Sequence, residues 1–226
     1  MVPDELTEAA FYGREDVAAL LDEGKVPLGL DLETVEPVTW DLKKGNLLYL
    51  TDKEEQMTQF VKQIARSKQK VIVLAPAYNE LPEMEGVTIL STKEDYVAGI
   101  KKMEENIQLR LEQQKSQHEA TIVLYNQLEL MNDLSMDLQS SLNYVLEKGA
   151  RAGYATVAMS GSQLNRKIDE VSKSIKLYKQ AIVAMRITDQ SVLNVINRPV
   201  REEPLDSQVN YYVEDGFVRK VKVLMK

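Results

Sequence analysis

The 226-residue sequence has no cysteine and a single histidine, His118. Without cysteine there is no disulfide framework, no thiolate metal site and no cysteine nucleophile. His118 lies in the polar run EQQKSQHEA, which is typical of an exposed segment. A histidine-based metal site or a Ser-His-Asp triad therefore has little support, and we expect no metal centre.

Long apolar runs and an excess of basic residues are also missing. No run reaches the roughly 18–20 apolar residues that cross a bilayer, and no signal peptide is recognisable. The net charge is −7, and the basic side chains cluster only at Arg219, Lys220 and Lys222. Because contact with phosphates requires a basic surface, we do not expect nucleic-acid binding. A hydrophobic content of 44% with 28% charged residues is typical of a soluble globular protein with a sizeable core.

Strand and helix patterns alternate along most of the chain. Short apolar, β-branched runs predict strands at 26–30, 37–41, 46–50, 71–75, 87–90, 121–125, 154–159 and 181–187. Helical spacing predicts helices at about 53–66, 93–116 and 136–149, a weaker one at 163–173, and a short one capped by Asp189 or Ser191. The last two runs, 211–214 and 217–224, flank Asp215-Gly216 and predict a β-hairpin. This alternation predicts a three-layer α/β fold with a mainly parallel sheet and an antiparallel C-terminal edge.

Two features of this organisation leave alternatives open. Residues 1–25 are expected to form a helix-prone lead-in, and residues 26–226 the domain itself. In the helix at 93–116, apolar residues recur from Tyr96 to Leu111 at helical spacing. This stripe indicates a core-facing helix surface, with a coiled-coil interface as the alternative.

A phosphate-binding loop is missing where the layout calls for one. Residues 46–66 give an apolar strand, a short polar connector and an amphipathic helix, the arrangement that carries Gly-x-x-x-x-Gly-Lys-Ser/Thr in nucleotide-binding proteins. The connector here is Thr51-Asp52-Lys53-Glu54-Glu55-Gln56, with no glycine and three carboxylates. Asp52 with Glu55, or Thr51 with Glu54, predicts a capping box that satisfies the helix N–H groups in place of phosphate. Lys53, between two carboxylates, is expected to be a solvated charge.

Several segments taken in order resemble the FtsK/SpoIIIE branch of RecA-like motor ATPases. These are residues 26–42, 47–50, 121–130, 142–163, 181–196 and 211–226. Within that branch the sequence is most similar to the last ATPase domain of the type VIIb secretion coupling proteins of Gram-positive bacteria. The resemblance implies a RecA-like fold whose ligands bind beyond the carboxyl ends of the strands, where Leu50, Tyr125 and Met159 end.

The same resemblance assigns the strand at 121–125 to the Walker B position. A metal-anchoring aspartate and a water-activating glutamate are expected after it, but Asn126 and Gln127 stand there. Amides supply no charge for Mg²⁺ and cannot act as a general base. Glu129, two residues further on, is expected to lie off the site. We therefore expect no catalytic residue, and no ATP or Mg²⁺ cofactor, in this domain.

Other candidate residues have more ordinary interpretations. Ser160-Gly161-Ser162 follows a strand and resembles a nucleophile position only loosely. Arg186, Arg198 and Arg201 are expected to form salt bridges, with a role in trans on a neighbouring ATPase as the alternative. Trp40 is expected to be a packing residue.

What the resemblance implies for function is a domain that binds and does not hydrolyse. Such a domain would lie at the cytoplasmic face of the cell membrane as part of a larger ATPase translocase. Its expected partners are secreted proteins of the WXG100 or related helical types, upstream ATPase domains of the same chain, and copies of itself in a hexamer. The alternative is a nucleotide-binding regulatory domain with weak or atypical ATP binding; a ring subunit without a ligand is a third interpretation.

Overall fold

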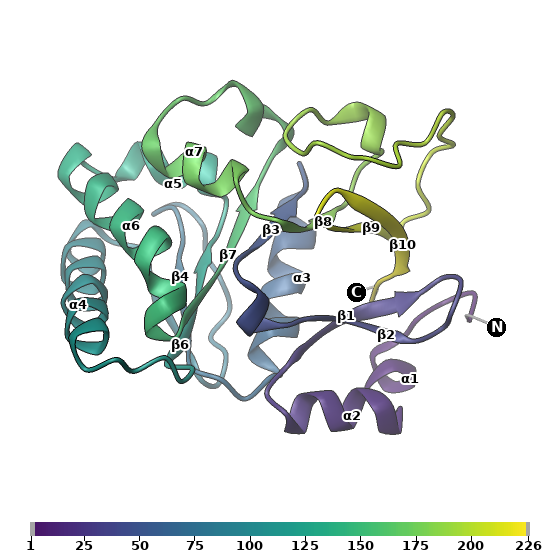
Figure 1. Ribbon diagram of the computed structural model, residues 1–226, viewed down its shortest axis with the longest axis horizontal. Coiled ribbons are helices and arrows are strands. Elements are labelled where there is room, and N and C mark those ends of the chain that lie inside the picture. Colours follow the sequence, from purple (N-terminus) through teal and green to yellow (C-terminus); the bar gives the residue numbers. More distant parts are fainter. Residues whose placement is uncertain (1–2, 225–226) are drawn as a thin grey trace.

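The runs predicted to be strands form one ten-stranded sheet in the computed structural model, which describes residues 3–224 (Figure 1). The strands are β1 (Val26–Asp31), β2 (Pro37–Trp40), β3 (Leu47–Leu50), β4 (Val71–Leu74), β5 (Val87–Leu90), β6 (Ala120–Leu124), β7 (Tyr154–Ser160), β8 (Gln180–Val183), β9 (Val209–Glu214) and β10 (Phe217–Lys222). Their order is β2-β1-β10-β9-β8-β3-β7-β6-β4-β5. The six strands from β8 to β5 pair in parallel, and the rest pair antiparallel. The predicted mixed sheet is confirmed.

The predicted C-terminal hairpin forms, but it does not lie at the edge of the sheet. Asp215 and Gly216 both have positive φ, 50° and 85°, as a two-residue hairpin turn requires. The N-terminal hairpin of β1 and β2 then pairs β1 with β10 and becomes the edge. Gly29 permits this approach, because a Cβ atom there would lie 2.2 Å from the Lys222 carbonyl oxygen. The expectation of a C-terminal edge is therefore wrong.

Helices cover both faces of this sheet and complete the predicted three layers. They are α1 (Glu8–Tyr12), α2 (Glu15–Asp22), α3 (Glu54–Ala65), α4 (Lys93–Glu112), α5 (Gln127–Asp133), α6 (Met136–Lys148) and α7 (Glu170–Lys176). Helices α4 to α7 pack on one face and α3 on the other. Adjacent β3 residues divide between the two cores, since Leu48 faces α4–α7 and Leu47 faces α3. Burial on both faces explains why the central strands read as unbroken apolar runs.

The apolar stripe of α4 faces the core. Tyr96, Ile100, Met103 and Ile107 are buried against the sheet and α6. A capping box between Thr92 and Asp95 starts the helix. The core-facing interpretation is confirmed.

Two helix predictions near the C-terminal third are wrong in detail. The helix expected at 163–173 is a 3-10 turn (Ser162–Arg166) followed by α7, which starts late because Asp169 caps it. The helix expected after Asp189 is absent, and only a 3-10 turn (Ile187–Asp189) forms. Side chains take the local hydrogen bonds there: Arg186 donates two, of 2.8 Å each, to the Asp189 carboxylate, and the Gln190 amide accepts from the Leu193 N–H at 2.8 Å.

Residues before β1 pack against the N-terminal hairpin and against the chain next to β9 and β10. Leu6, Phe11 and Val17 form a small apolar cluster with Leu30 and Leu224. The Leu6 N–H and carbonyl each form a 3.2 Å hydrogen bond with the Gln208 side chain. Figure 1 shows α1 and α2 beside β1 and β2, at the end of the molecule opposite α4. The predicted boundary between a lead-in and a domain at residue 25 remains a prediction. The described part of the lead-in packs on the rest of the fold.

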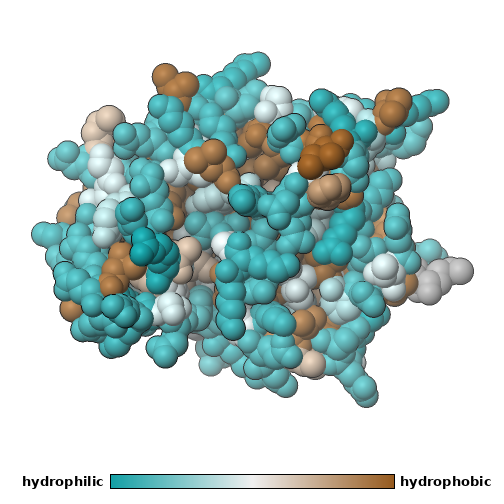
Figure 2. Space-filling model, viewed as in Figure 1, coloured by the Kyte–Doolittle hydropathy of each residue, from teal (hydrophilic) through white to brown (hydrophobic). Residues whose placement is uncertain are grey.

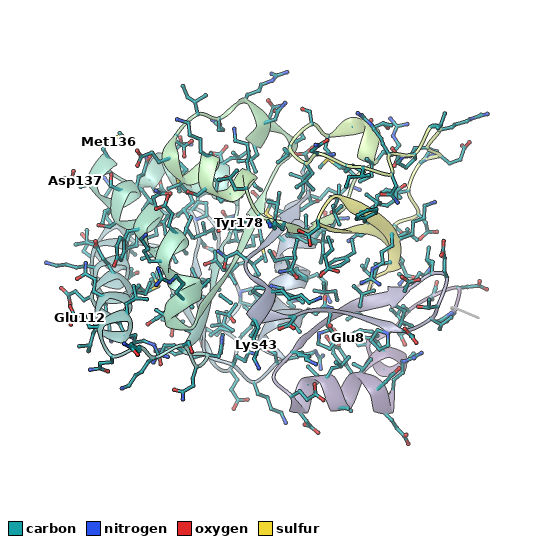
Figure 3. All side chains as sticks on the ribbon, viewed as in Figure 1. Glu8, Lys43, Glu112, Met136, Asp137 and Tyr178 are labelled. Atoms are coloured by element: carbon teal, nitrogen blue, oxygen red, sulfur yellow. The ribbon has the colours of Figure 1, made fainter. Side chains whose placement is uncertain are left out.

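The surface is mainly polar. In the view of Figure 2, apolar side chains form small separate patches within a hydrophilic face. Figure 3 shows Met136 at the outer tip of α6, where it is 77% exposed. Over residues 3–224, no helix combines the length and the apolar character that crossing a membrane would need.

Candidate functional site

The carboxyl ends of β3, β7 and β6 lie side by side at one end of the strands, in the middle of the sheet and away from its outermost strands. β7 lies between the other two strands, with Leu50 opposite Ser160 and Leu124 opposite Ala158. The residues that follow these strands therefore share one end of the sheet, as the sequence predicted. We call residues 51–56 the phosphate-loop position, and Asn126 with Gln127 the metal-anchoring position.

The phosphate-loop position is a short turn held by its own first residue. Thr51 is fully buried, and its N–H donates to the Ser160 carbonyl at 2.9 Å. Its hydroxyl oxygen accepts from the Lys53 N–H at 3.1 Å and contacts the Gln56 amide oxygen. No residue from 51 to 56 has a positive φ. This backbone does not curl into the cradle of N–H groups that a phosphate loop presents.

The capping box predicted here does not form. Helix α3 begins at Glu54, with Lys53 as its N-cap and no side-chain capping bond. Asp52 turns away from the helix, and its Oδ1 accepts from the Ser162 N–H at 2.7 Å. Gly161 leaves space for this contact, because a Cβ atom there would lie 2.6 Å from Asp52 Oδ1. The Asp52–Ser162 bond spans 110 residues, so no local sequence pattern could have indicated it.

A second bond joins the phosphate-loop position and the metal-anchoring position directly. Asn126 Nδ2 donates to Glu54 Oε1 at 2.9 Å and to the Tyr78 hydroxyl at 3.1 Å. Asn79 Nδ2 adds a longer bond of 3.3 Å to the other Glu54 oxygen. Asn126 has φ 47°, a left-handed conformation that asparagine tolerates better than most residues. Side chains of the phosphate-loop position and the metal-anchoring position therefore bind each other.

Gln127, the second residue of the metal-anchoring position, has both ends of its side-chain amide hydrogen-bonded to buried serines. It is fully buried; its Nε2 bonds with Ser172 Oγ at 3.1 Å and its Oε1 accepts from Ser160 Oγ at 3.0 Å. Ser160 is itself fully buried. His118 is exposed and precedes β6, so it lies at the amino ends of the strands, opposite the site. The loose resemblance of Ser160 to a nucleophile finds no base beside it.

The remaining candidates form contacts of an ordinary structural kind, and Glu129 lies near enough to the site to act on Tyr78 by its charge. Glu129 is exposed and accepts a bond from Asn132 at 3.2 Å. Arg186 pairs with Asp189, and Arg201 lies 3.5 Å from Glu203, which confirms the expected salt bridges for these two. The predicted pairing of Arg198, which is exposed, stays a prediction. Trp40 is buried and donates to the Gly45 carbonyl at 2.9 Å, as expected of a packing residue.

The site at the strand ends is acidic. The Tyr78 side chain is 60% exposed; partial loss of water at its hydroxyl raises the pKa of the phenol, and the carboxylates of Glu54, Glu129 and Asp133 raise it further. Lys53 is exposed and is the only cation within the phosphate-loop position. Across residues 3–224, no group of three or more histidine, aspartate and glutamate side chains is placed to hold a metal ion. The site thus presents negative charge where a triphosphate would lie.

The mixed ten-stranded sheet with helices on both faces has the RecA-like fold of P-loop ATPases, which confirms the predicted fold class. No family model matches the sequence. Over 99% of its length the chain is 24% identical to the type VII secretion system protein EssC of Staphylococcus aureus (strain MRSA252), of which it spans 16%. The resemblance to the ATPase domains of type VII secretion coupling proteins, seen in the sequence, is thereby confirmed.

Solved structures agree with this similarity. The EssC structure (ATPases 2 and 3) from Geobacillus thermodenitrificans matches 99% of the chain with a TM-score of 0.86 and 18% identity, over 45% of its own length. Thermomonospora curvata EccC (ATPases 2 and 3), in complex with a signal sequence peptide, matches the whole chain with a TM-score of 0.73 and 16% identity, over 44% of its own length. The chain corresponds to less than half of each of these proteins.

Proposed function

We propose that this chain is an ATPase-like domain of a type VII secretion coupling protein, that it does not hydrolyse ATP, and that it docks secreted substrates. Its similarity to EssC over nearly all of its length supports the secretion role. In this proposal the parent protein is an ATPase translocase at the cytoplasmic face of the cell membrane. The domain stacks on neighbouring ATPase domains of the same chain, and copies of the parent assemble as a hexamer.

The observation that carries the loss of hydrolysis is the pair of bonds across the strand ends. Asp52 occupies the Ser162 N–H and Glu54 occupies Asn126, at 2.7 and 2.9 Å. A triphosphate placed there would have to break both bonds and approach the carboxylates that made them. Like charges at such short range repel, so the bound state would lose the favourable interactions on which phosphate loops depend.

The chemistry beyond binding is missing as well. A catalytic Mg²⁺ requires an anionic oxygen ligand, and the attacking water requires a base or an orienting group. Asn126 is committed to Glu54 and Tyr78, and Gln127 is buried between two serines. Neither amide has the charge for these roles, and Gln127, which is fully buried, also lacks the access.

The docking role is supported by a relative. The EccC structure of the second and third ATPases was solved in complex with a signal sequence peptide. A domain of the same fold without a working nucleotide site retains its surfaces for such a contact. The substrates in this proposal are WXG100-like or related helical proteins, held through a terminal segment.

Two measurements on the purified domain test the proposal. Calorimetric titration with terminal peptides of secreted substrates should show binding, while a coupled phosphate assay shows no ATP turnover. At a ligand concentration 100 times Kd, binding to the folded state alone raises stability by about 2.7 kcal/mol. A melting shift of that kind in millimolar Mg-ATP, or phosphate release abolished by the Asp52→Ala variant, would contradict the loss of nucleotide chemistry.

One observation favours the alternative, a nucleotide-binding regulatory domain. A cavity of about 320 Å³ lies beside α3 and reaches the phosphate-loop position at Lys53 and Gln56. The stacked rings of Tyr49 and Phe60, 4.6 Å apart, form part of its wall. Such a cavity suits a base better than a triphosphate. Melting scans with adenosine and with Mg-ATP separate the two, because this alternative requires a shift with at least one of them.

A further inference from the structure

Strand β5 ends the sheet with an open hydrogen-bonding edge. Within the described residues it pairs with β4 alone. The carbonyl oxygens of Gly86 and Leu90 accept hydrogen bonds from the β4 side, at 3.1 and 3.0 Å. Because these bonds alternate along a parallel strand, the Val87 carbonyl and the N–H and carbonyl of Ile89 point away from β4. They form a short row of donors and acceptors that another strand could pair with.

This edge lacks the usual protection against pairing. Edge strands in soluble proteins are normally blunted by charged side chains, proline or a bulge. The β5 sequence is Val-Thr-Ile-Leu, four residues with no charge and no proline, and it pairs with β4 without a break in register. On the α3 face, Leu81 and Met84 pack in the same core as Val87 and Ile89. On the opposite face of β5, Thr88 is exposed and Leu90 is partly buried against α4.

A cavity of about 280 Å³ lies on that face, between β5 and α4. Its apolar walls come from Ile72, Leu90, Met103 and Tyr154. Gly99 lets Leu90 pack closely on α4 at the cavity wall, since a Cβ atom at that position would lie 2.3 Å from Leu90 Cδ1. The Tyr154 hydroxyl already accepts a 2.6 Å bond from Asn106. The cavity therefore has the size and character for one aliphatic or aromatic side chain.

The rim of the cavity favours a negative group, although the chain as a whole carries −7. Lys70 and Lys102 line it with one carboxylate, Asp95, and Asp95 already accepts a bond from the Thr92 N–H. Lys70 lies 3.9 Å from Glu119, which Arg110 holds more closely at 2.9 Å. Among residues 3–224, Lys102 is in no salt bridge.

We propose that β5 and this cavity bind an extended segment of a partner protein, which adds a strand to the sheet. An apolar side chain of that segment fills the cavity, and an aspartate or glutamate two residues away meets Lys70 and Lys102. Alternate residues of a strand face the same side, which fixes that spacing. Strand addition combines main-chain bonds for affinity with side-chain pockets for specificity. The inference rests on the proposed docking function and deepens it, by giving the docking site a place and its occupant a chemistry.

The first test uses synthetic peptides as probes. A fluorescein-labelled heptapeptide of β-branched residues with Phe-Thr-Glu at its centre should bind the domain in an anisotropy titration. A matched peptide with Phe-Thr-Lys should bind about fivefold more weakly, because its charge meets the lysine rim. N-methylation of one alternating set of its amides should abolish binding, while methylation of the other set should leave it unchanged. Equal effects of the two sets, or no binding of the Phe-Thr-Glu peptide, would overturn the proposal.

The second test uses protein variants at exposed positions, which limits the risk of misfolding. Ala98 lines the cavity, so Ala98→Phe should fill it and reduce binding about tenfold, the effect of losing one buried side-chain anchor. Val97 is 51% exposed and does not line the cavity, so Val97→Phe is the matched control. Lys102→Glu should weaken binding of the acidic peptide and strengthen that of the lysine peptide, with Lys101→Glu as its control. Equal affinities of Ala98→Phe and Val97→Phe would place the peptide elsewhere.

A third measurement separates this inference from the docking function itself. Secreted WXG100-like proteins are titrated against the wild-type domain and against Ala98→Phe. Binding to both with equal affinity leaves the docking function standing and rejects β5 as its place. Binding of the probe peptides without binding of any secreted protein supports the β5 site and rejects the proposed substrates.

Discussion

Asn126 donates a 2.9 Å hydrogen bond to Glu54, across the strand ends where a nucleotide would lie in an active relative of this fold. The two residues are 72 positions apart in the chain. Glu54 belongs to the phosphate-loop position and Asn126 to the metal-anchoring position, so this bond links the two positions. Because these side chains bind each other, they can be tested by stability as well as by activity.

Two substitutions at Asn126 separate its bond from its backbone conformation. Asn126→Gly removes the bond to Glu54 and should destabilise the domain by about 0.5–1 kcal/mol, as expected for a partly exposed hydrogen bond. Asn126→Ala also places a Cβ-bearing residue without a local hydrogen bond at φ 47°, which adds about 1 kcal/mol. Urea unfolding of both variants checks the order. An alanine variant as stable as the glycine one would show that the left-handed conformation relaxes.

A double-mutant cycle tests the contact between Asp52 and Gly161. Gly161 has φ −94° and ψ 174°, which any residue can adopt, so the obstacle to Gly161→Ala is the Asp52 carboxylate 2.6 Å away. Asp52→Ala alone should lose about 1–2 kcal/mol with the bond to Ser162. In that background, Gly161→Ala should become neutral or slightly stabilising. Strict additivity of the two changes would mean that the carboxylate is not the neighbour that limits position 161.

A glutamate at position 127 should make stability depend on pH. Gln127 is fully buried, so Gln127→Glu would have a folded-state pKa raised above its unfolded value by burial. The loss of stability is then small below about pH 4 and grows by about 1.4 kcal/mol per pH unit until the folded-state pKa is passed. Gln127→Leu is the control, since it breaks the same serine contacts without a titrating group. Parallel pH profiles for the two variants would refute the buried position of this side chain.

Glu202 should contribute stability at neutral pH that is lost in acid. Its carboxylate accepts from the N–H groups of Ile187 and Thr188, at 2.8 and 2.7 Å. Burial, the largest single influence, acts to raise the pKa of Glu202, but the hydrogen bonds from Tyr211 and from these N–H groups together lower it.

A lowered folded-state pKa stabilises the fold above the unfolded value and loses that effect as the pH falls through the folded one. Glu202→Gln should therefore be less stable than wild type near neutrality, and the difference should shrink below about pH 4. Glu203→Gln, at a side chain that is 80% exposed, is the matched control and should leave the profile unchanged.

Much of the fold follows from local patterns because the central strands are buried on both faces. Runs such as Val71–Leu74 are apolar at every position, and the stripe of α4 repeats at helical spacing. The missing glycines at 51–56 and the amides at 126 and 127 can also be read directly. What local patterns cannot supply is the partner of each side chain. The local pattern predicts that Asp52 and Glu54 cap α3, but Ser162 and Asn126, brought near by the sheet order, offer hydrogen bonds that the local turn does not.

The same limit explains the misplaced sheet edge. A hairpin at the end of a sequence suggests the last strands of a sheet, and nothing local to β10 shows that another hairpin will cover it. The residue that permits the contact is Gly29, whose only visible signal is a glycine inside an apolar strand. Such a glycine indicates close approach of another backbone, without indicating which one.

The antiparallel contact of β1 with β10 also gives the domain a mechanical polarity. Because Leu30 pairs with Lys222 and Asp31 with Val221, tension applied between residues 3 and 224 would load these strands from the same end. Their hydrogen bonds would then open one after another, as in a zipper, at low force. Two sets of contacts lie between residue 3 and β1: the two bonds between Leu6 and Gln208, and the apolar cluster around Phe11. These contacts must break before tension reaches the bonds between β1 and β10. Strand β5, at the far end of the sheet order, would keep its shape while the opposite end yields.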